Sequence, residues 1–536
     1  MHMYLIGIVL LSWLIYSRPA PWISFQAEAF AYGIFFMVAL WWVAKRQKPI
    51  EVPRLLTVAV ASVVVAAGVS YASSTALTAN VHLAVFHLAA LLVAFVVGYN
   101  ASPTAPGHGH NAAGEWHKLA ALVVVGLVTG AFGLVQWSGL VDYTTSTLSW
   151  LMPAPVAGRI MGNIGQANLF ALSMAFGLLM TLYLVHDKQI GWVVGSLLVV
   201  FFAFVIGLSQ SRAILLGLLL SAGLMAIKRP SRGGQVLLYL AVAIAVGVST
   251  MGNWFLEHLN PSAGVRSVLE PSGISLRLEL WQALLAAAWA EPLRADGLGG
   301  TVVRYFDVLP QLQMGNAVHF TYAHNLYVDM VVWLNPILGT ALFGLLLYGM
   351  ATLTYRVQGR DVYGWLTVVV CATHAMFEFP FAYFSLVFIP ALVAGYVSRQ
   401  YSRSPPIQLR RTLVWSCMAA TAAFGAWIFY DYTKIYHSYL AVQIERRFHT
   451  KPDEAELNPS VTWLRDWSQH LQYARGSNEA GCQQLAHTHD AEVRRMIMLH
   501  PSPFAIQRLL TCNTVSDAEK AYWRARYPEL APTTNP

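Results

Sequence analysis

Long apolar runs recur along this chain from its N-terminal end to about residue 430, and they constrain its fold more than any other feature. The hydrocarbon core of a bilayer is about 30 Å thick, and a helix needs roughly 20 apolar residues to cross it. Of the 536 residues, 56% are hydrophobic and only 11% are charged, whereas a soluble domain carries roughly 25% charged residues. The sequence therefore predicts a polytopic membrane protein and excludes an ordinary cytosolic enzyme.

The apolar runs are continuous rather than alternating, which favours membrane helices over the strands of a β-barrel. We expect an all-α polytopic membrane protein with about 12 to 13 transmembrane helices. The first run lacks the basic start and the small-residue cleavage site of a signal peptide, so it is interpreted as a retained span. The expected spans are residues 3–17, 23–44, 55–71, 81–99, 119–138, 168–185, 190–208, 213–227, 235–252, 337–354, 362–379, 381–398 and 412–430.

Lysine and arginine are distributed unevenly between the predicted loops, and short cytoplasmic loops retain positive charge. With the N-terminus inside, the short outer loops contain only Arg18, Arg159 and Arg212. The inner loops then contain Lys45, Arg46, Lys48, Arg54, Lys118, Lys188, Lys228, Arg229, Arg232, Arg356, Arg360, Arg399, Arg403, Arg410 and Arg411. This bias predicts that the large loop at about residues 253–322 and the tail after residue 430 face outward, which in a bacterium is the periplasm.

The tail differs in composition from the rest of the chain, so we expect two domains. Residues 1–430 form a transmembrane domain, and residues 431–536 form a small helical domain with amphipathic patterning in 434–448, 455–475 and 492–511. Cys482 and Cys512 lie in this tail, and an oxidising compartment permits a disulfide between them; two free thiols are the alternative. The net charge of +8 comes largely from the inner loops and requires no nucleic-acid partner.

Polar side chains interrupt the apolar pattern almost entirely on the predicted outer side. The stretches are GRIMGNIGQANLF (158–170), LSQSRAILL (208–216), SLRLELW (275–281), the segment with His319, His324 and Asp329, and THAMFEFPFAYF (373–384). Ionisable groups at membrane depth are costly and usually face a cavity or a partner. Each residue alone has a structural interpretation, as a surface histidine or a local cap, but their common side predicts a functional site. The HGH sequence at 108–110 lies in a Gly- and Pro-containing inner loop, where no metal site is expected.

The residue types in this set suit one kind of chemistry. Guanidinium groups such as Arg212 and Arg277 recognise phosphate through forked, charge-assisted hydrogen bonds. A neutral histidine can accept the proton of a hydroxyl group as a general base. Both kinds of residue lie at the predicted headgroup level, so the sequence indicates group transfer from a lipid pyrophosphate.

The motifs also resemble a known family. GNIGQANLFA, SQSRA, SLRLELWQAL followed by DGLGG, AHNLYVDMVVWLNPILG and HAMFEFPFAYF are similar to motifs of the O-antigen ligase and polymerase superfamily. The Gly-Asn-x-Gly-Gln-x-Asn and Glu-x-Pro-x-x-Tyr stretches and the tail resemble its protein-glycosylating branch, the bacterial protein O-oligosaccharyltransferases or pilin glycosylation ligases. The resemblance covers most of the chain, from RPAPWISFQAEAFA to the tail.

This resemblance implies a membrane glycosyltransferase of the C-type architecture in the bacterial inner membrane. It would transfer an oligosaccharide from undecaprenyl pyrophosphate to a Ser or Thr hydroxyl of a pilin or other periplasmic protein, without a metal or other cofactor. Matched motif by motif, His324, Tyr383 and Gln166 would be catalytic. The donor-binding residues would be Arg212, Arg277, Arg159, Asn163, His319, Asn325 and Glu378.

Two other functions remain open. Within the same superfamily, the acceptor could be a lipid A-core, or the enzyme could polymerise O-antigen repeat units. From another class, a transporter of lipid-linked glycans would also place polar residues among its spans. Transporters often carry paired Gly/Pro-interrupted segments and a midplane site, and neither pattern is evident in this sequence.

Overall fold

A computed structural model describes most of the chain. The described residues are 9–15, 25–72, 78–101, 120–139, 141, 151–155, 158–259, 272–312, 320–401, 405–448, 482–483, 485, 490–499 and 503–530. The chain folds into two compact units, each assembled from segments far apart in sequence. The first unit comprises Met1–Val60, His87–Pro271 and Leu345–Ala423, and the second comprises Ala61–Phe86, Ser272–Gly344 and Phe424–Pro536.

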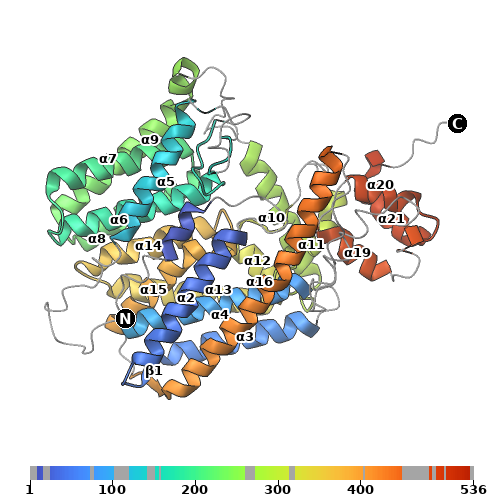
Figure 1. Ribbon diagram of the computed structural model, residues 1–536, viewed down its shortest axis with the longest axis horizontal. Helices are drawn as coiled ribbons and strands as arrows, with labels where there is room; N and C mark the ends of the chain where they lie inside the picture. Colours follow the sequence, from blue (N-terminus) through green and yellow to red (C-terminus); the bar gives the residue numbers. More distant parts are fainter. Residues whose placement is uncertain are drawn as a thin grey trace. The chain divides into compact units, whose positions relative to one another are not determined.

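Helices dominate both units (Figure 1). The α-helices are α2 (Phe25–Lys45), α3 (Arg54–Ala72), α4 (Thr78–Ala101), α5 (Ala121–Trp137), α6 (Ala167–His186), α7 (Trp192–Ser209), α8 (Arg212–Lys228), α9 (Arg232–Leu259), α10 (Ser272–Ala290), α11 (Thr301–Val308), α12 (Leu326–Leu334), α13 (Pro336–Arg356), α14 (Asp361–Ala375), α15 (Phe384–Tyr401), α16 (Arg411–Phe448), α19 (Asp490–Leu499), α20 (Pro503–Thr511) and α21 (Asp517–Arg526). Short 3-10 helices are η1 (Leu10–Leu14), η4 (Leu309–Gln311), η6 (Pro380–Ala382) and η8 (Pro528–Leu530).

The prediction of an all-α polytopic membrane protein is confirmed. Among the described residues, seven helices are long and apolar enough to cross a membrane: α2, most of α4, α6, α7, the first part of α9, α13 and the first part of α16. Helices also occupy the other predicted spans from residue 55 onward, but they are shorter or less apolar. The predicted number of 12 to 13 spans therefore stays a prediction.

Two elements differ in detail from the predicted spans. The described part of the first predicted span contains the 3-10 helix η1 rather than an α-helix, and residues 1–8 and 16–17 lie outside the described residues. The span predicted at 412–430 and the amphipathic segment at 434–448 form the single helix α16. No helix breaker separates these two segments, so the hydrogen-bond ladder continues from one to the other.

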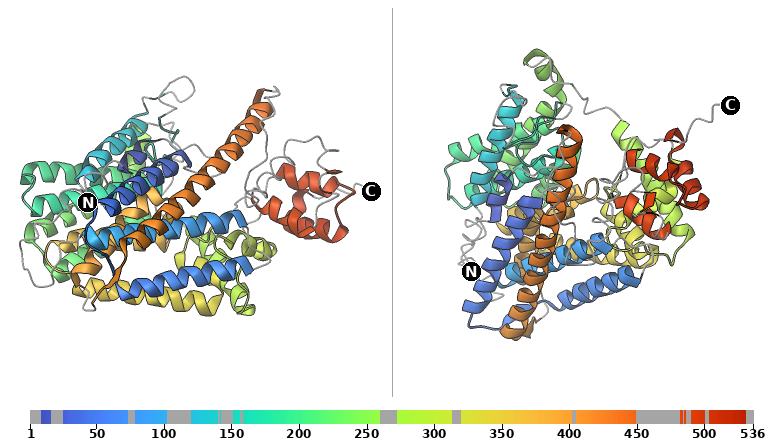
Figure 2. Two further views of the ribbon diagram at one scale, coloured as in Figure 1. Left: turned by 60° about the horizontal axis from the view of Figure 1, so that its bottom comes forward. Right: turned by 45° about the vertical axis from the view of Figure 1, so that its right-hand side comes forward.

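The first unit is a helical bundle around α6. Helix α6 packs against α5, α7 and α14, and nearly all of its residues are buried. Helices α5 to α9 lie side by side in this bundle (Figures 1 and 2). Helices α4 and α15 cross closely because Gly395 has no side chain, and a Cβ there would clash with the carbonyl oxygen of Phe95.

A two-stranded sheet joins two loops that the charge pattern places on the inner side. Strand β1 (Ile50–Val52) pairs antiparallel with β2 (Ile407–Leu409). Arg399 contacts Glu51 at 2.5 Å, and Arg411 donates to the carbonyl of Arg46 at 2.8 Å. The pairing indicates that the loops after α2 and α15 lie on the same side of the first unit, as the predicted topology requires.

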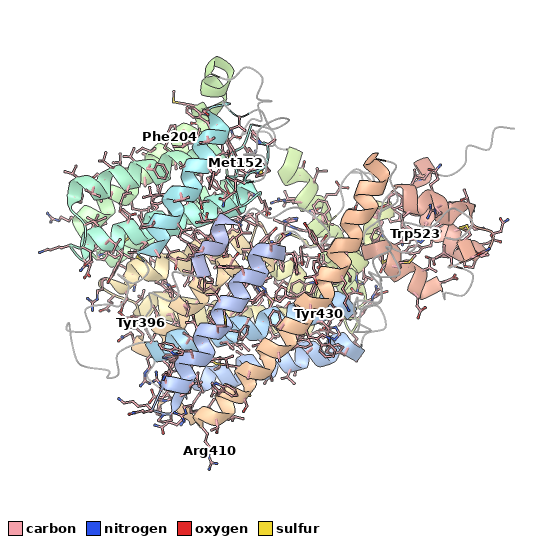
Figure 3. All side chains as sticks on the ribbon, viewed as in Figure 1. Met152, Phe204, Tyr396, Arg410, Tyr430 and Trp523 are labelled. Carbon is pink, nitrogen blue, oxygen red and sulfur yellow. A yellow bond between two sulfur atoms is a disulfide. The ribbon has the colours of Figure 1, made fainter. Side chains whose placement is uncertain are left out.

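The second unit combines segments from the large loop and the tail. Helices α10, α11 and α12 come from residues 272–334, and α19 to α21 come from the tail (Figure 1). Trp523 of α21, labelled in Figure 3, is fully buried and contacts the ring of Phe306 of α11 at a centroid distance of 5.5 Å. The tail and the large loop therefore share one apolar core.

Candidate active site

The loop before α6 brings several predicted site residues into the first unit. Gln136 of α5 holds this loop, because its side-chain oxygen accepts from the N–H groups of Met161 and Gly162 at 2.9 and 2.8 Å. Its amide nitrogen donates to the carbonyls of Pro153 and Gly162. Gly162 has φ of +55°, and a Cβ there would meet the ring of Phe170. Glycine is required at this turn for both reasons.

An arginine, an asparagine and a glutamate form a hydrogen-bonded cluster in the first unit, which we call the outer polar cluster. Arg159 donates to the side-chain oxygen of Asn168 at 2.6 Å, and Asn168 donates to the Glu378 carboxylate at 2.6 Å. Arg159 also donates to the carbonyl of Ser209 at 2.8 Å. Three of the predicted outer stretches, at 158–170, 208–216 and 373–384, therefore meet at this cluster.

Arg212 begins helix α8, next to the turn that Arg159 contacts. Gln210 in this turn has φ of +52°, and Ser211 is the N-cap residue of α8. Gln210 and Ser211 are buried, and their side-chain oxygens have no hydrogen-bond partner among the described residues. A helix N-terminus carries a partial positive charge and free N–H groups, so Arg212 lies where an anion is favoured.

Tyr383 and Gln166 occupy other parts of the first unit. Tyr383 follows η6 and is half-buried, and Gln166 is the half-buried N-cap residue of α6, whose side chain makes no cap hydrogen bond. Tyr383 borders an open pocket with about 300 Å³ of empty space, including its mouth. The other residues that line the pocket are Ser12, Trp13, Ile15, Ala27, Ile164, Ser385 and Leu386. Asn163 is buried nearby and donates to the carbonyl of Trp13.

His324 lies in the second unit and has an unusual backbone conformation. Its φ is +55°, in the left-handed region that non-glycine residues seldom adopt. Its ring is half-buried and contacts the ring of Phe320 edge-on, at a centroid distance of 6.0 Å. The next residue, Asn325, caps α12 by accepting from the N–H groups of Tyr327 and Val328 at 3.0 and 3.3 Å.

Helix α10 places Arg277 on the face that contacts the histidine segment. Trp281 of α10 donates its indole N–H to the carbonyl of Ala323 at 2.7 Å. Residues four apart lie on one face of a helix, so Arg277 lies one turn from Trp281 on this face. Arg277 is half-buried there. The second unit therefore brings Arg277 and His324 into one neighbourhood.

A buried carboxylate lies beside His324. Asp329 of α12 is fully buried, and one of its oxygens accepts from the Thr301 hydroxyl at 2.6 Å and from the Ala323 N–H at 2.9 Å. Burial raises the pKa of Asp329 to about 6, although these hydrogen bonds and the neighbouring His324 act in the opposite direction. Burial and the charge of Asp329 also raise the pKa of Tyr322.

The remaining predicted sites have different outcomes. The structure contains a disulfide between Cys482 and Cys512. His319 and the HGH sequence at 108–110 lie outside the described residues. Within the part of the chain that the structure describes, no three His, Cys, Asp or Glu side chains gather as metal ligands would.

Some residues that shape these sites have a role that the sequence did not reveal. Gln136, Trp281 and Thr301 each act through a hydrogen bond to a segment distant in sequence. Trp281 belongs to the SLRLELW stretch, but only the tertiary contacts show what each of these three residues holds. The sequence could have pointed to Gln136 alone, because an amide side chain within an apolar run needs a hydrogen-bond partner.

Comparisons with known proteins match most of the chain. Residues 197–334 match the family model described as O-antigen ligase, and residues 362–531 match that described as virulence factor membrane-bound polymerase, C-terminal. A General O-oligosaccharyltransferase of Acinetobacter baylyi is 24% identical over 529 residues, 94% of this chain and 87% of the relative. A ComP-specific O-oligosaccharyltransferase of the same organism is 24% identical over 256 residues, 47% of this chain and 46% of the relative.

The chain is therefore a multi-spanning membrane protein whose residues 197–334 are similar to the O-antigen ligase family. Its resemblance to the bacterial O-oligosaccharyltransferases, predicted from the motifs, is confirmed by the two relatives. Arg212, Arg277 and His324 lie in the segment that matches O-antigen ligase, and Glu378 and Tyr383 lie in the segment that matches the polymerase C-terminal model.

Proposed function

We propose that this protein transfers an oligosaccharide from undecaprenyl pyrophosphate to a Ser or Thr hydroxyl of a pilin or other periplasmic protein. The observation that carries the proposal is the position of His324, whose strained backbone is tethered on both sides and whose neighbouring helix presents Arg277. The two oligosaccharyltransferase relatives support glycan transfer as the reaction class. The reaction would take place at the periplasmic face of the bacterial inner membrane.

Arginine binds the donor in this proposal. Arg212 and Arg277 would hold the pyrophosphate through charge-assisted hydrogen bonds, which are favourable where water is partly excluded. Arg159 would support this binding indirectly, because its hydrogen bonds to Ser209 and Asn168 orient the turn before Arg212. Asn163, Gln166, Glu378 and Tyr383 would contact the glycan or its phosphates.

His324 acts on the acceptor or on the leaving group. Either it removes the proton of the acceptor hydroxyl as this oxygen attacks the anomeric carbon, or it stabilises the departing lipid pyrophosphate. The bond between the anomeric carbon and the phosphate oxygen breaks as the new glycosidic bond forms. The protein's own residues supply the acid–base and charge stabilisation in this proposal, without a metal ion.

Replacing the histidine tests the proposal directly. Protein purified in lipid nanodiscs is mixed with undecaprenyl pyrophosphate oligosaccharide and pilin, and the mass of the intact pilin is measured. We expect His324→Ala to lower the transfer rate at least 100-fold, because general acid–base catalysis typically contributes 10²–10⁴-fold.

The matched control is His82→Ala in the same unit, where the imidazole packs against the rings of Tyr71 and Phe424. This variant should transfer glycan at the normal rate. A His324→Ala protein that folds and transfers glycan normally would refute the proposed role.

A second candidate function differs only in the acceptor. The match of residues 362–531 to a polymerase C-terminal model favours polymerisation of repeat units, and the match of residues 197–334 to an O-antigen ligase model favours ligation to a lipid A-core. The same donor offered with pilin, with lipid A-core and with a second lipid-linked repeat unit separates these outcomes. We expect mass to be added to the pilin alone.

A further inference from the structure

The residue immediately before His324 is held at both of its backbone groups. The N–H of Ala323 donates to the buried Asp329 carboxylate at 2.9 Å, and the carbonyl of Ala323 accepts from the indole N–H of Trp281 at 2.7 Å. We call these two hydrogen bonds the Ala323 clamp. The second bond fixes the peptide plane between Ala323 and His324, so it sets the direction in which the histidine leaves the backbone.

The clamp lies where the backbone is strained. A left-handed conformation is unfavourable for a non-glycine residue, and such residues persist only where the surroundings determine them strongly. After His324, the cap formed by Asn325 fixes the start of α12. His324 is therefore tethered from both directions.

Asp329 is itself oriented by groups that come from another helix. Thr301, at the start of α11, donates its hydroxyl to the same carboxylate oxygen at 2.6 Å. The hydroxyl of Thr301 in turn accepts from the indole N–H of Trp333 at 2.8 Å. All three side chains are buried. The chain Trp333, Thr301, Asp329, Ala323 is a continuous path of hydrogen bonds that ends beside His324.

The second carboxylate oxygen of Asp329 has no hydrogen-bond partner among the described residues. A buried carboxylate with an unsatisfied oxygen is costly, so apolar packing alone does not explain this residue. The negative charge interacts favourably with His324.

We propose that Asp329, together with Trp281 and Thr301, is a positioning residue for His324. The clamp holds the imidazole at its reacting position, and none of the three side chains is required to touch substrate. The inference rests on the proposed catalytic role of His324. The inference goes beyond that role, because it assigns a function to three residues that the comparison of motifs left without one.

Trp281 offers the first test because a phenylalanine keeps a smaller aromatic side chain and removes the N–H donor. We expect Trp281→Phe to lower kcat for glycan transfer roughly 10- to 100-fold while the KM for the lipid donor changes less than twofold, since small misplacements of a reacting group have effects of this size. The matched control is Trp289→Phe on the exposed part of the same helix, which should leave both constants unchanged. A normal kcat in Trp281→Phe would overturn the proposal.

Thr301 and Asp329 give two further pairs of variants. Thr301→Val keeps the shape and removes the hydroxyl, whereas Thr301→Ser keeps the hydroxyl. Asp329→Ala removes the acceptor, whereas Asp329→Asn keeps an oxygen for the Ala323 N–H. We expect Thr301→Val and Asp329→Ala to lower kcat at least 10-fold. We expect Thr301→Ser and Asp329→Asn to keep most of the wild-type kcat.

The folding of each variant is checked by thermal unfolding and by size-exclusion chromatography in detergent. The value of kcat is then expressed per amount of folded protein. Equal kcat in all four variants would overturn the inference. The result for His324→Ala tests the proposed function, and the results for the clamp variants test the inference. If that variant is inactive while the clamp variants are normal, the inference fails and the proposed function stands. If His324→Ala is fully active, the proposed function fails.

Discussion

At the scale of single residues, the site depends on groups placed against their intrinsic preferences. His324 and Gln210 both have left-handed backbone conformations. His324 is the residue that we assign to catalysis, and Gln210 lies two positions before Arg212. Asp329 is a carboxylate buried without full hydrogen bonding. Such residues reduce stability, and proteins tolerate them mainly where function needs them.

The raised pKa of Asp329 makes a prediction about stability. Its folded pKa of about 6 exceeds its usual value of 3.8. The folded state therefore binds the proton more tightly than the unfolded state, so the contribution of Asp329 to stability is present below about pH 4 and is lost as pH rises through 6. We expect a change on the order of 2–3 kcal/mol, because each pKa unit corresponds to about 1.4 kcal/mol.

The measurement compares the wild-type protein with Asp329→Asn by thermal unfolding between pH 4.5 and pH 7.5. Relative to the variant, the wild type should gain stability as the pH falls through 6. A constant difference across this range would contradict the prediction, since all other titrating groups are shared by the two proteins.

Arg212 gives a second prediction at this scale. Hydrogen bonds to charged groups contribute about 1.5–3 kcal/mol, so Arg212→Ala should raise the KM for lipid donor roughly 10- to 100-fold. Arg232→Ala is the matched control, because Arg232 also begins a helix but lies on the predicted inner side. Its donor KM should match that of the wild type. An unchanged donor KM in Arg212→Ala would remove this residue from the donor site.

At the scale of elements, the tail helices depend on the large loop for part of their core. Trp523 packs on Phe306, and Arg526 donates to the carbonyl of Phe306 at 2.6 Å while it lies over the ring of Tyr522. Helix α11, which carries Phe306, also carries Thr301. The same short helix therefore contacts the tail and orients Asp329.

This arrangement predicts that truncating Trp523 destabilises the tail. Trp523→Ala should cost about 3–5 kcal/mol, because it removes a large buried ring and leaves a cavity. Limited proteolysis of the purified protein should then cleave the tail faster than in the wild type. Arg524→Ala, at an exposed position of the same helix, should leave the cleavage rate unchanged. Equal protection of the tail in Trp523→Ala and the wild type would contradict the shared core.

The helices themselves were largely predictable. Continuous apolar runs identified α2, α4 and α6 within a few residues of their ends, because the bilayer imposes its thickness on any helix that crosses it. The end of α14 at Ala375 was not predicted, since the following residues are still apolar. Only the packing of the outer loop around Glu378 explains why the helix stops there.

At the scale of the whole molecule, the predicted topology gives one further prediction. Thr321 is exposed beside His324, and Lys188 is exposed in a predicted inner loop. In cells with a permeabilised outer membrane, a membrane-impermeant maleimide should label Thr321→Cys and should not label Lys188→Cys. The background for both is Cys417→Ser, because Cys417 is the exposed free cysteine of the described residues. Labelling of Lys188→Cys alone would place the histidine on the cytosolic side and end the proposed mechanism.

The domain boundary predicted at residue 430 illustrates the limit of composition. It falls within the continuous helix α16, and the compact units join segments from both sides of it. The boundary therefore stays a prediction. Composition indicates where the surroundings of a chain change from lipid to water. A single helix can continue across that boundary without a break.

The sequence by itself determined that this is a helical membrane protein and that it resembles the O-oligosaccharyltransferases. These properties follow from hydrophobicity, charge and residue spacing, and each of these can be judged from a short segment of the sequence. Only the tertiary structure decided that Gln136 holds the loop before α6, that Asn168 joins Arg159 to Glu378, and that Asp329 and Trp281 hold the backbone at His324. Each of these is a hydrogen bond between a side chain and a partner on another segment, and its energy depends on distance and angle that no single segment specifies.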